Sequence, residues 1–189
     1  TGLALLVNSL ATGSILFVLI TMFGPTSGAH FNPAVTLAFF MCKAISSKNT
    51  IGYVMAQLLG SVLGVWLAHA MFDTAIIQVS EKVRTGSAQW LSEAVATCGL
   101  VGTILVTVRV RVDAVALSVG LYITAAYWFT ASTSFANPAV SIARSLTDTF
   151  SGIRPDDVLP FVISQLVATL LTVWFYRWFV GHQQESEML

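Results

Sequence analysis

Charged residues are scarce in this chain. Its 189 residues include nine Lys or Arg and nine Asp or Glu, so 10% are charged and the formal net charge is zero. A soluble domain carries about 25% charged residues, so this chain lacks the groups that cover a water-facing surface. It also has no run of basic residues, and nothing in the sequence indicates nucleic acid as a partner.

Cysteines and catalytic motifs are also scarce. Cys42 and Cys98 are the only cysteines, and they form neither a disulfide framework nor a CxxC pair, so we interpret them as small packing residues. The sequence has no HExxH motif, no paired carboxylates and no Ser/His pair at a suitable spacing. We therefore expect no metal, no cofactor and no enzyme, including an intramembrane enzyme.

Hydrophobic residues, in contrast, make up 56% of the chain. A bilayer core of about 30 Å needs roughly 20 apolar residues per helix, and five runs reach that length: residues 2–23, 51–72, 90–108, 114–130 and 158–180. The first run is too long, and lacks the basic leader, for a signal peptide. The sequence predicts an all-α protein that spans the lipid bilayer of the cell's inner (plasma) membrane several times.

Two further apolar segments, residues 32–42 and 137–146, are about half as long. A short helix at membrane depth must be buried in protein or line a wet cavity, because unpaired backbone groups are too costly in lipid. The segments that precede them, residues 24–30 and 132–135, are small and polar and are expected to be non-helical. The distribution of Lys and Arg weakly favours a cytoplasmic first short helix and C-terminus.

The two short segments belong to an internal repeat. Residues 31–38 and 136–143 are identical at five of eight positions, and each octet is followed by a full span. This pattern predicts inverted repeats with a site at the bilayer midplane, within one channel domain of residues 1–189 whose repeats cover 1–88 and 89–189. Two spans precede the second octet and one precedes the first. We therefore expect an N-terminally truncated six-span protein, the alternative being a natural five-span variant.

Each octet contains an Asn-Pro-Ala box, which starts a helix. Asn is a good N-cap and Pro is favoured at the first helical position. Two half-helices entering from opposite faces would bring their positive N-termini together, and their Asn amides would donate to a passing oxygen. Such a centre interrupts a proton wire and repels cations. The boxes consist of Asn32, Pro33, Ala34, Asn137, Pro138 and Ala139.

The sequence resembles the aquaporin (major intrinsic protein) family in residues 27–36 and 135–140, and Ala56, Gln57 and Glu93 also match the family pattern. The resemblance covers essentially the whole chain. It implies an aquaporin-like right-handed bundle of six tilted helices and two re-entrant half-helices, with a pore in each protomer of a homotetramer. Five full spans are present here, and the first helix of the family pattern is missing. Half-helix dipoles that exclude protons and cations are a known feature of such pores.

The selectivity filter departs from the family pattern. The resemblance puts the filter at Thr12, Ala125, Ser134 and Val140, where Val140 stands in place of the usual Arg. Loss of this Arg removes a positive charge and several donors, so we expect a wide, uncharged constriction. Loop residues expected to line the pore are Gly28, Ala29, His30, Ser132, Thr133 and Phe135.

Other polar residues are expected to support the pore. Glu93, Gln57 and Gln165 are interpreted as structural, with a proton relay at Glu93 as the alternative. His30 is expected to brace its loop rather than act as a pH gate. Arg144 lies one helical turn beyond Val140 and could restore a charge in the outer vestibule. We favour the alternative, in which Arg144 is structural and pairs with Asp148 or loop carbonyls.

Val in place of the filter Arg resembles a bacterial subgroup of the family that is associated with arsenic resistance. The sequence therefore predicts passive permeation of small neutral solutes such as arsenite, with glycerol and water. A plain water or glycerol channel is one alternative. An ion-coupled secondary transporter is another, although such coupling normally needs acidic residues at the midplane.

Overall fold

The computed structural model describes residues 2–186, and every regular element in that range is a helix. The α-helices and the two 3₁₀ turns are α1 (Gly2–Ser27), α2 (Pro33–Met41), α3 (Ser47–Met71), α4 (Ser87–Val110), η1 (Val112–Ala114), α5 (Val115–Phe129), α6 (Pro138–Ala143), η2 (Arg144–Leu146) and α7 (Pro155–Ser186). Five of these helices are long and apolar enough to cross a membrane. The predicted all-α membrane fold with five spans and two half-helices is confirmed.

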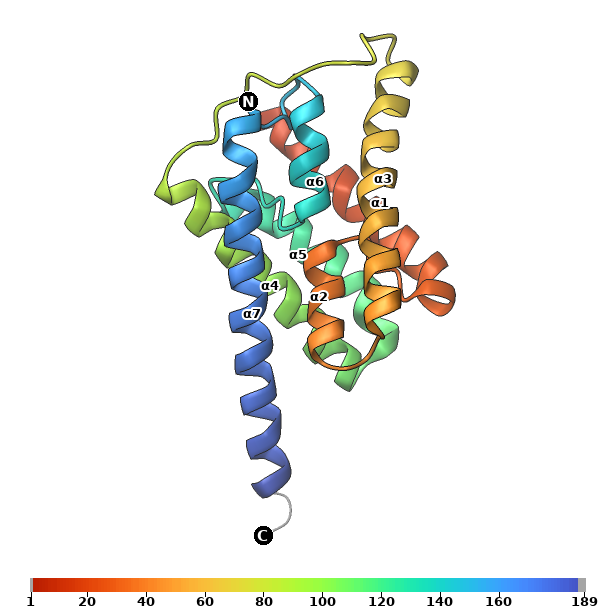
Figure 1. Cartoon of the computed structure of the whole chain (residues 1–189), viewed down its shortest axis with the longest axis vertical. Helices are drawn as coiled ribbons and strands as arrows, with labels where there is room; N and C mark the ends of the chain where they lie inside the picture. Colours follow the sequence, from red (N-terminus) through yellow and green to blue (C-terminus); the bar gives the residue numbers. More distant parts are fainter. Residues whose placement is uncertain (1, 187–189) are drawn as a thin grey trace.

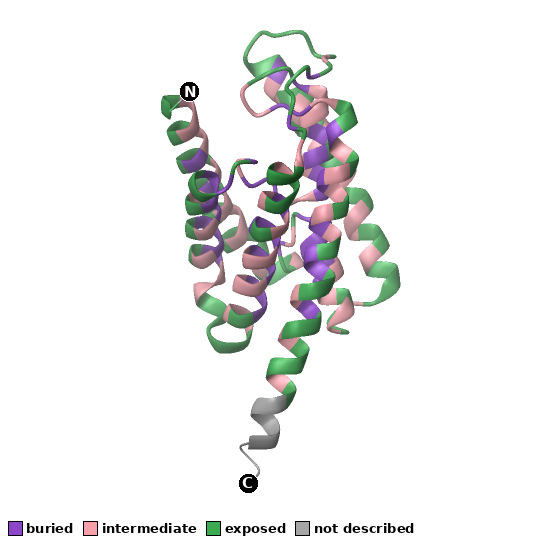
Figure 2. Cartoon of the chain, turned by 90° about the vertical axis from the view of Figure 1, so that its left-hand side faces the viewer, coloured by how far each residue is buried: buried purple, intermediate pink, exposed green. Residues whose placement is uncertain are grey.

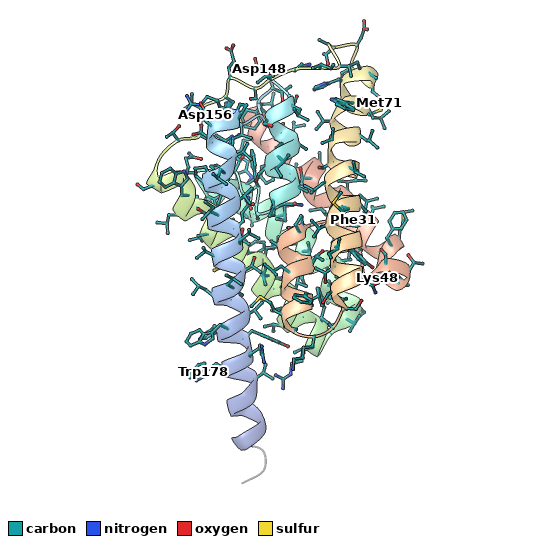
Figure 3. The ribbon with its side chains drawn as sticks, in the orientation of Figure 1. Phe31, Lys48, Met71, Asp148, Asp156 and Trp178 are labelled. Atoms are coloured by element: carbon teal, nitrogen blue, oxygen red, sulfur yellow. The ribbon has the colours of Figure 1, made fainter. Side chains whose placement is uncertain are left out.

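The half-helices α2 and α6 lie one above the other in the centre of the molecule (Figure 1). Their chains leave in opposite directions, since Asp148 lies at the top of the molecule and Lys48 lies on the other side of Phe31, at the lower end of α3 (Figure 3). Phe31, which precedes the first box, lies between Asp148 and Lys48. The N-termini of α2 and α6 therefore meet halfway across the bundle.

Helix contacts repeat between the two halves of the chain. Helix α2 packs against α3 and α7, while α6 packs against α7 and α3, and α1 packs against α5. Exchanging α1, α2 and α3 for α5, α6 and α7 leaves this set of contacts unchanged. Helix α4 packs against α5 and α7.

The contact between α1 and α5 depends on two glycines. A Cβ atom on Gly120 would lie 2.7 Å from the carbonyl oxygen of Gly13, and one on Gly13 would overlap the side chain of Thr124. The two backbones approach so closely that neither position has room for a side chain.

Buried residues follow the inner faces of the helices, whereas the outer faces and the helix ends are exposed (Figure 2). The exposed residues include large apolar side chains such as Leu59, Trp174 and Leu3. Helix α3 buries only His69. An apolar exterior of this extent is suited to lipid rather than water.

One boundary differs from the expectation. Residues 24–27 were expected to lie in a non-helical loop, but α1 continues to Ser27 and contains Pro25. The last turn is held by a hydrogen bond from the Gly28 amide to Gly24 O, and the Tyr53 hydroxyl donates to the carbonyl of Ser27. These bonds satisfy the final carbonyls, so the helix persists until Gly28 turns into the left-handed region with φ of 71°.

Candidate functional site

The two Asn-Pro-Ala boxes cap α2 and α6 in the same way. Asn32 Oδ1 accepts a hydrogen bond from the Ala34 amide at 2.9 Å, and Asn137 Oδ1 accepts from the Ala139 amide at 3.0 Å. Pro33 and Pro138 occupy the first helical positions, where a missing N–H costs nothing. Because each side-chain oxygen faces its own helix, each side-chain NH₂ must face away from it.

The boxes are also bonded to one another across the repeat. Asn32 Nδ2 donates to Ala136 O at 2.7 Å, and Asn137 Nδ2 donates to Phe31 O at 3.0 Å. Each amide thus uses one hydrogen to bind the carbonyl that precedes the other box. Each amide has a second hydrogen that can bind an acceptor in the cavity, which both residues line.

The loops that lead to the boxes share an unusual backbone. Residues 28, 29 and 31 have positive φ, and so do residues 133, 134 and 136, which are their counterparts in the repeat. Five of these six residues are not glycine, and a left-handed backbone costs each of them about 1–2 kcal/mol. Such strain persists only where the surroundings hold it.

Glu93 holds the second loop. Its Oε1 accepts from the Phe135 amide and its Oε2 from the Ala136 amide, both at 2.8 Å. Gln165 Nε2 donates to the same Oε2 at 2.6 Å and to Ser141 Oγ at 2.9 Å. Both carboxylate oxygens therefore bind loop or support groups, which is the arrangement expected of a structural residue rather than a proton relay.

The first loop is held by a related cluster. Gln57 Nε2 donates to Thr36 Oγ1 at 2.9 Å, and this pair repeats Gln165 and Ser141. His30 Nδ1 lies 3.1 Å from the same Thr36 hydroxyl, and its ring stacks on Phe39 at 4.6 Å between centroids. Burial lowers the pKa of His30 below its usual value. These contacts fix the His30 ring against Thr36 and Phe39, and its bracing role stays a prediction.

A single cavity of about 170 Å³ connects these features. Both box asparagines line it, as do Gly28, Ala29 and His30 of the first loop and Ser134 and Phe135 of the second. Of the other two expected loop residues, Ser132 is fully buried and Thr133 partly so, and neither lines it. The rest of the wall is mainly aliphatic and comes from four helices: Leu16, Ile20, Val35, Leu100, Ile104, Val108, Val115, Val119 and Ile123. The lining therefore combines an aliphatic wall with polar groups of the boxes and their loops.

The end of the cavity at Thr12, Val140 and Arg144, called its outer end from here on, differs from the expected filter. Thr12, Ser134 and Val140 line the cavity, but Ala125 does not and lies on an exposed side of α5. Tyr127 takes its place, with 3% of its surface exposed, and its hydroxyl lies 3.1 Å from Thr12 Oγ1. Residues two apart on a helix point about 200° apart, so Ala125 faces away from the cavity that Tyr127 lines.

Arg144 also lies at this end of the cavity. Its Nη2 donates to the Tyr127 hydroxyl at 3.0 Å, and its guanidinium carbon lies 4.3 Å from the centroid of the Phe135 ring. The expected pairing with Asp148 is not formed, since Asp148 Oδ1 accepts from the Glu81 amide instead. The constriction is therefore neither free of aromatic residues nor uncharged.

Arg84, from the loop between α3 and α4, was not identified from the sequence. It is 5% exposed and donates to the carbonyls of Gly152 and Ser132 at 2.7 and 2.8 Å, so it ties three outer segments together. Its guanidinium carbon lies 4.7 Å from the centroid of the Phe135 ring. Burial first, and then the charge of Arg144, lower its pKa to about 10, so it stays charged at neutral pH.

Comparisons with known proteins agree with this site. The family model described as "Major intrinsic protein" matches residues 2–112, which is more than half of the chain. The chain is 56% identical over 177 residues to aquaglyceroporin AqpS of Rhizobium meliloti (strain 1021), a match that covers 94% of this chain and 76% of the relative.

More distant relatives come from Arabidopsis thaliana. The chain is 38% identical to aquaporin PIP2-7 over 73 residues, covering 39% of this chain and 26% of the relative. It is 27% identical to aquaporin NIP3-1 over 180 residues, covering 89% and 55%. Together with the five spans and the paired boxes, these matches show that the chain belongs to the major intrinsic protein family and is a multi-pass plasma-membrane channel for small neutral solutes, not an enzyme.

Proposed function

We propose that the channel conducts arsenite, present at neutral pH as the uncharged As(OH)₃, together with glycerol and water. The observation that carries this proposal is the continuous cavity lined by both box asparagines, with Val140 beside Asn137. The relative AqpS is named an aquaglyceroporin, which supports solutes larger than water.

The lining accounts for passage of a neutral hydroxylated solute. Solute oxygens accept hydrogen bonds from Asn32 and Asn137, and solute hydroxyls donate to the loop carbonyls. The aliphatic wall has no polar groups that could replace the hydration shell of an ion, so ions face a large desolvation cost. The desolvation cost of a neutral molecule with several hydroxyls is smaller, because the polar groups of the boxes and loops replace some of its hydrogen bonds to water.

Val140 sets the width next to the second box. Its side chain adds no donor and no charge, whereas an Arg there would project a long guanidinium toward the passage. We expect Val140→Arg to reduce glycerol and arsenite permeability by about tenfold or more, with water permeability falling less.

The test is stopped-flow and radiotracer uptake in proteoliposomes, with water, glycerol and arsenite measured side by side. Val79→Arg, a change of the same kind at an exposed position in the outer loop, is the matched control. Arsenite uptake no faster than in empty vesicles would refute the arsenite assignment. Unchanged glycerol uptake by Val140→Arg would refute the role of Val140.

Two alternatives make different predictions. A plain water or glycerol channel would exclude arsenite in the same assay. A secondary transporter would accumulate solute against its gradient when an ion gradient is applied. The lining residues of the cavity, within the described chain, include no Asp or Glu to bind a coupling ion, and this favours the passive channel.

We also propose a homotetramer, as the family resemblance implies, with one pore in each protomer. Helices α1 and α3 expose apolar side chains such as Leu3 and Leu59, which can pack against lipid or another protomer. Native mass spectrometry of the detergent-solubilised protein should give the mass of four chains. A monomer that retains full permeability would contradict the assignment.

A further inference from the structure

Two polar groups at the outer end of the pore have no partner. Arg144 Nη1 and Ser134 Oγ are buried atoms without a hydrogen bond to any described residue, and both residues line the cavity. Ser134 is 3% exposed. A buried donor left unpaired costs about 1–3 kcal/mol, so a site that retains two of them is suited to a ligand that pairs with them.

The neighbours of Arg144 fix the direction of its free donor. Nη2 is bound to the Tyr127 hydroxyl, which in turn lies 3.1 Å from Thr12 Oγ1, and the guanidinium plane is held over Phe135. A planar guanidinium with one nitrogen bound cannot turn its other nitrogens freely. Nη1 is therefore held in place before a solute arrives, which lowers the entropic cost of binding.

We propose that Arg144 Nη1 and Ser134 Oγ form an outer binding site for two hydroxyl oxygens of one neutral solute, a polyol or an uncharged oxyacid. Arg144 donates to one oxygen, and Ser134 donates to or accepts from the other. This inference rests on the proposed function and specifies where that function selects its solute. In the family pattern an Arg occupies the position of Val140, beside the second box. Here the positive charge is supplied by Arg144, one helical turn further along the chain. The apolar surface of Val140 is thus left next to Asn137.

The same site excludes cations. Arg84 contacts the ring of Phe135 together with Arg144. Its guanidinium donates to carbonyl and hydroxyl oxygens rather than to a carboxylate, although the charge of Glu93 also acts on it. The guanidinium groups of buried Arg84 and half-buried Arg144 therefore both act on any ion that enters this end of the cavity. The desolvated surroundings strengthen that repulsion relative to water.

The experiment compares Arg144→Gln, Arg144→Lys and Tyr127→Phe in proteoliposomes. The matched control is Arg111→Gln. Arg111 lies between α4 and η1, does not line the cavity, and has a side chain that is 68% exposed. Two quantities are measured for each variant: the glycerol concentration that gives half-maximal flux, and the leak of K⁺ relative to glycerol.

We expect Arg144→Gln to raise the half-saturating glycerol concentration about tenfold, the effect of one charge-assisted hydrogen bond, and to raise the relative K⁺ leak. Arg144→Lys keeps the charge but not the two-nitrogen geometry, so it should restore cation exclusion and leave half-saturation high. Tyr127→Phe frees the guanidinium and should raise half-saturation with cation exclusion retained. A purely structural Arg144 would change total flux without altering the ratio of K⁺ to glycerol.

The outcomes separate this inference from the proposed function. A parent channel no more permeable to neutral solutes than empty vesicles would overturn both. A permeable parent whose Arg144→Gln variant keeps the same half-saturation and K⁺ leak would overturn the outer site alone. If Arg144→Gln does not reconstitute as a folded protein, Tyr127→Phe decides, and parent-like half-saturation in that variant refutes the site.

Discussion

Replacement of Glu93 by Gln should destabilise the second loop more than any other single isosteric change in the chain. The carboxylate accepts from two backbone amides with two different oxygens, at 2.8 Å each, and both loop residues are buried. A Gln side chain has one acceptor oxygen, so its NH₂ group must face one of the two amides. The variant then loses one charge-assisted bond and leaves a buried N–H unpaired.

The magnitude follows from these two losses. A hydrogen bond to a charged group contributes about 1.5–3 kcal/mol, and an unpaired buried donor costs about 1–3 kcal/mol. The total is about 2.5–6 kcal/mol, which lowers the unfolding temperature of a chain of this size by about 5–24 °C. The loop carries Ser134 and leads to Asn137, so glycerol permeability should fall with stability.

Thermal unfolding in detergent, followed by size-exclusion chromatography after heating, measures the shift. Because membrane proteins often unfold irreversibly, all variants must be heated at one rate. Glu81→Gln, at an exposed position in the outer loop, is the control and should unfold within about 1 °C of the parent protein. A Glu93→Gln variant that is as stable as the parent would refute the support role of this carboxylate.

Three further substitutions test other features. Gly13→Ala should separate α1 from α5 and cost about 1–3 kcal/mol of stability by overpacking. Its control, Gly60→Ala, has nothing within 4 Å of the added Cβ and should be neutral or stabilising. Equal unfolding temperatures of the two variants would contradict the close contact between α1 and α5. Ala29→Gly should lower the free energy of unfolding by about 1–2 kcal/mol less than Ala38→Gly does. The reason is that Ala29 has a left-handed φ of 47°, which suits Gly, whereas Ala38 lies in a regular helix. Urea unfolding of the two variants measures the difference. Burial lowers the pKa of His30 in the folded chain below 6.5, so the unfolded chain binds a proton more readily and the stability should fall as the pH drops below about 6.5. His30→Asn should flatten this dependence of the unfolding temperature on pH. An unchanged slope in that variant would count against the lowered pKa.

The sequence was sufficient for those parts of the site that depend on local patterns. An Asn-Pro pair at a helix start specifies a cap from its own residues, so both boxes were placed correctly within their half-helices. The spans follow from hydrophobic length alone. The interactions of Glu93 with the second loop are those expected from the family pattern.

Tyr127 was missed, and Arg144 was assigned the wrong partner, because their contacts depend on helix register and on packing between segments. The filter positions were assigned from the family pattern, which does not show which face of α5 lines the cavity. A signal was present: Val119, Ile123 and Tyr127 recur every four residues, as on one face of a helix. Arg84 had no comparable signal, since its partners are carbonyls of distant loops.

The cross-bonds between the two boxes also constrain when the pore can form. The bond from Asn32 to Ala136 spans 104 residues, and that from Asn137 to Phe31 spans 106. A chain inserted from its N-terminus carries the first box in the membrane long before the second box is synthesised. Until then the Asn32 amide lacks its carbonyl partner, and the contacts that close the centre are among the most distant in the sequence. The centre of the channel can therefore close only after the second box is synthesised, so a chain that ends before it does not hold the arrangement that conducts.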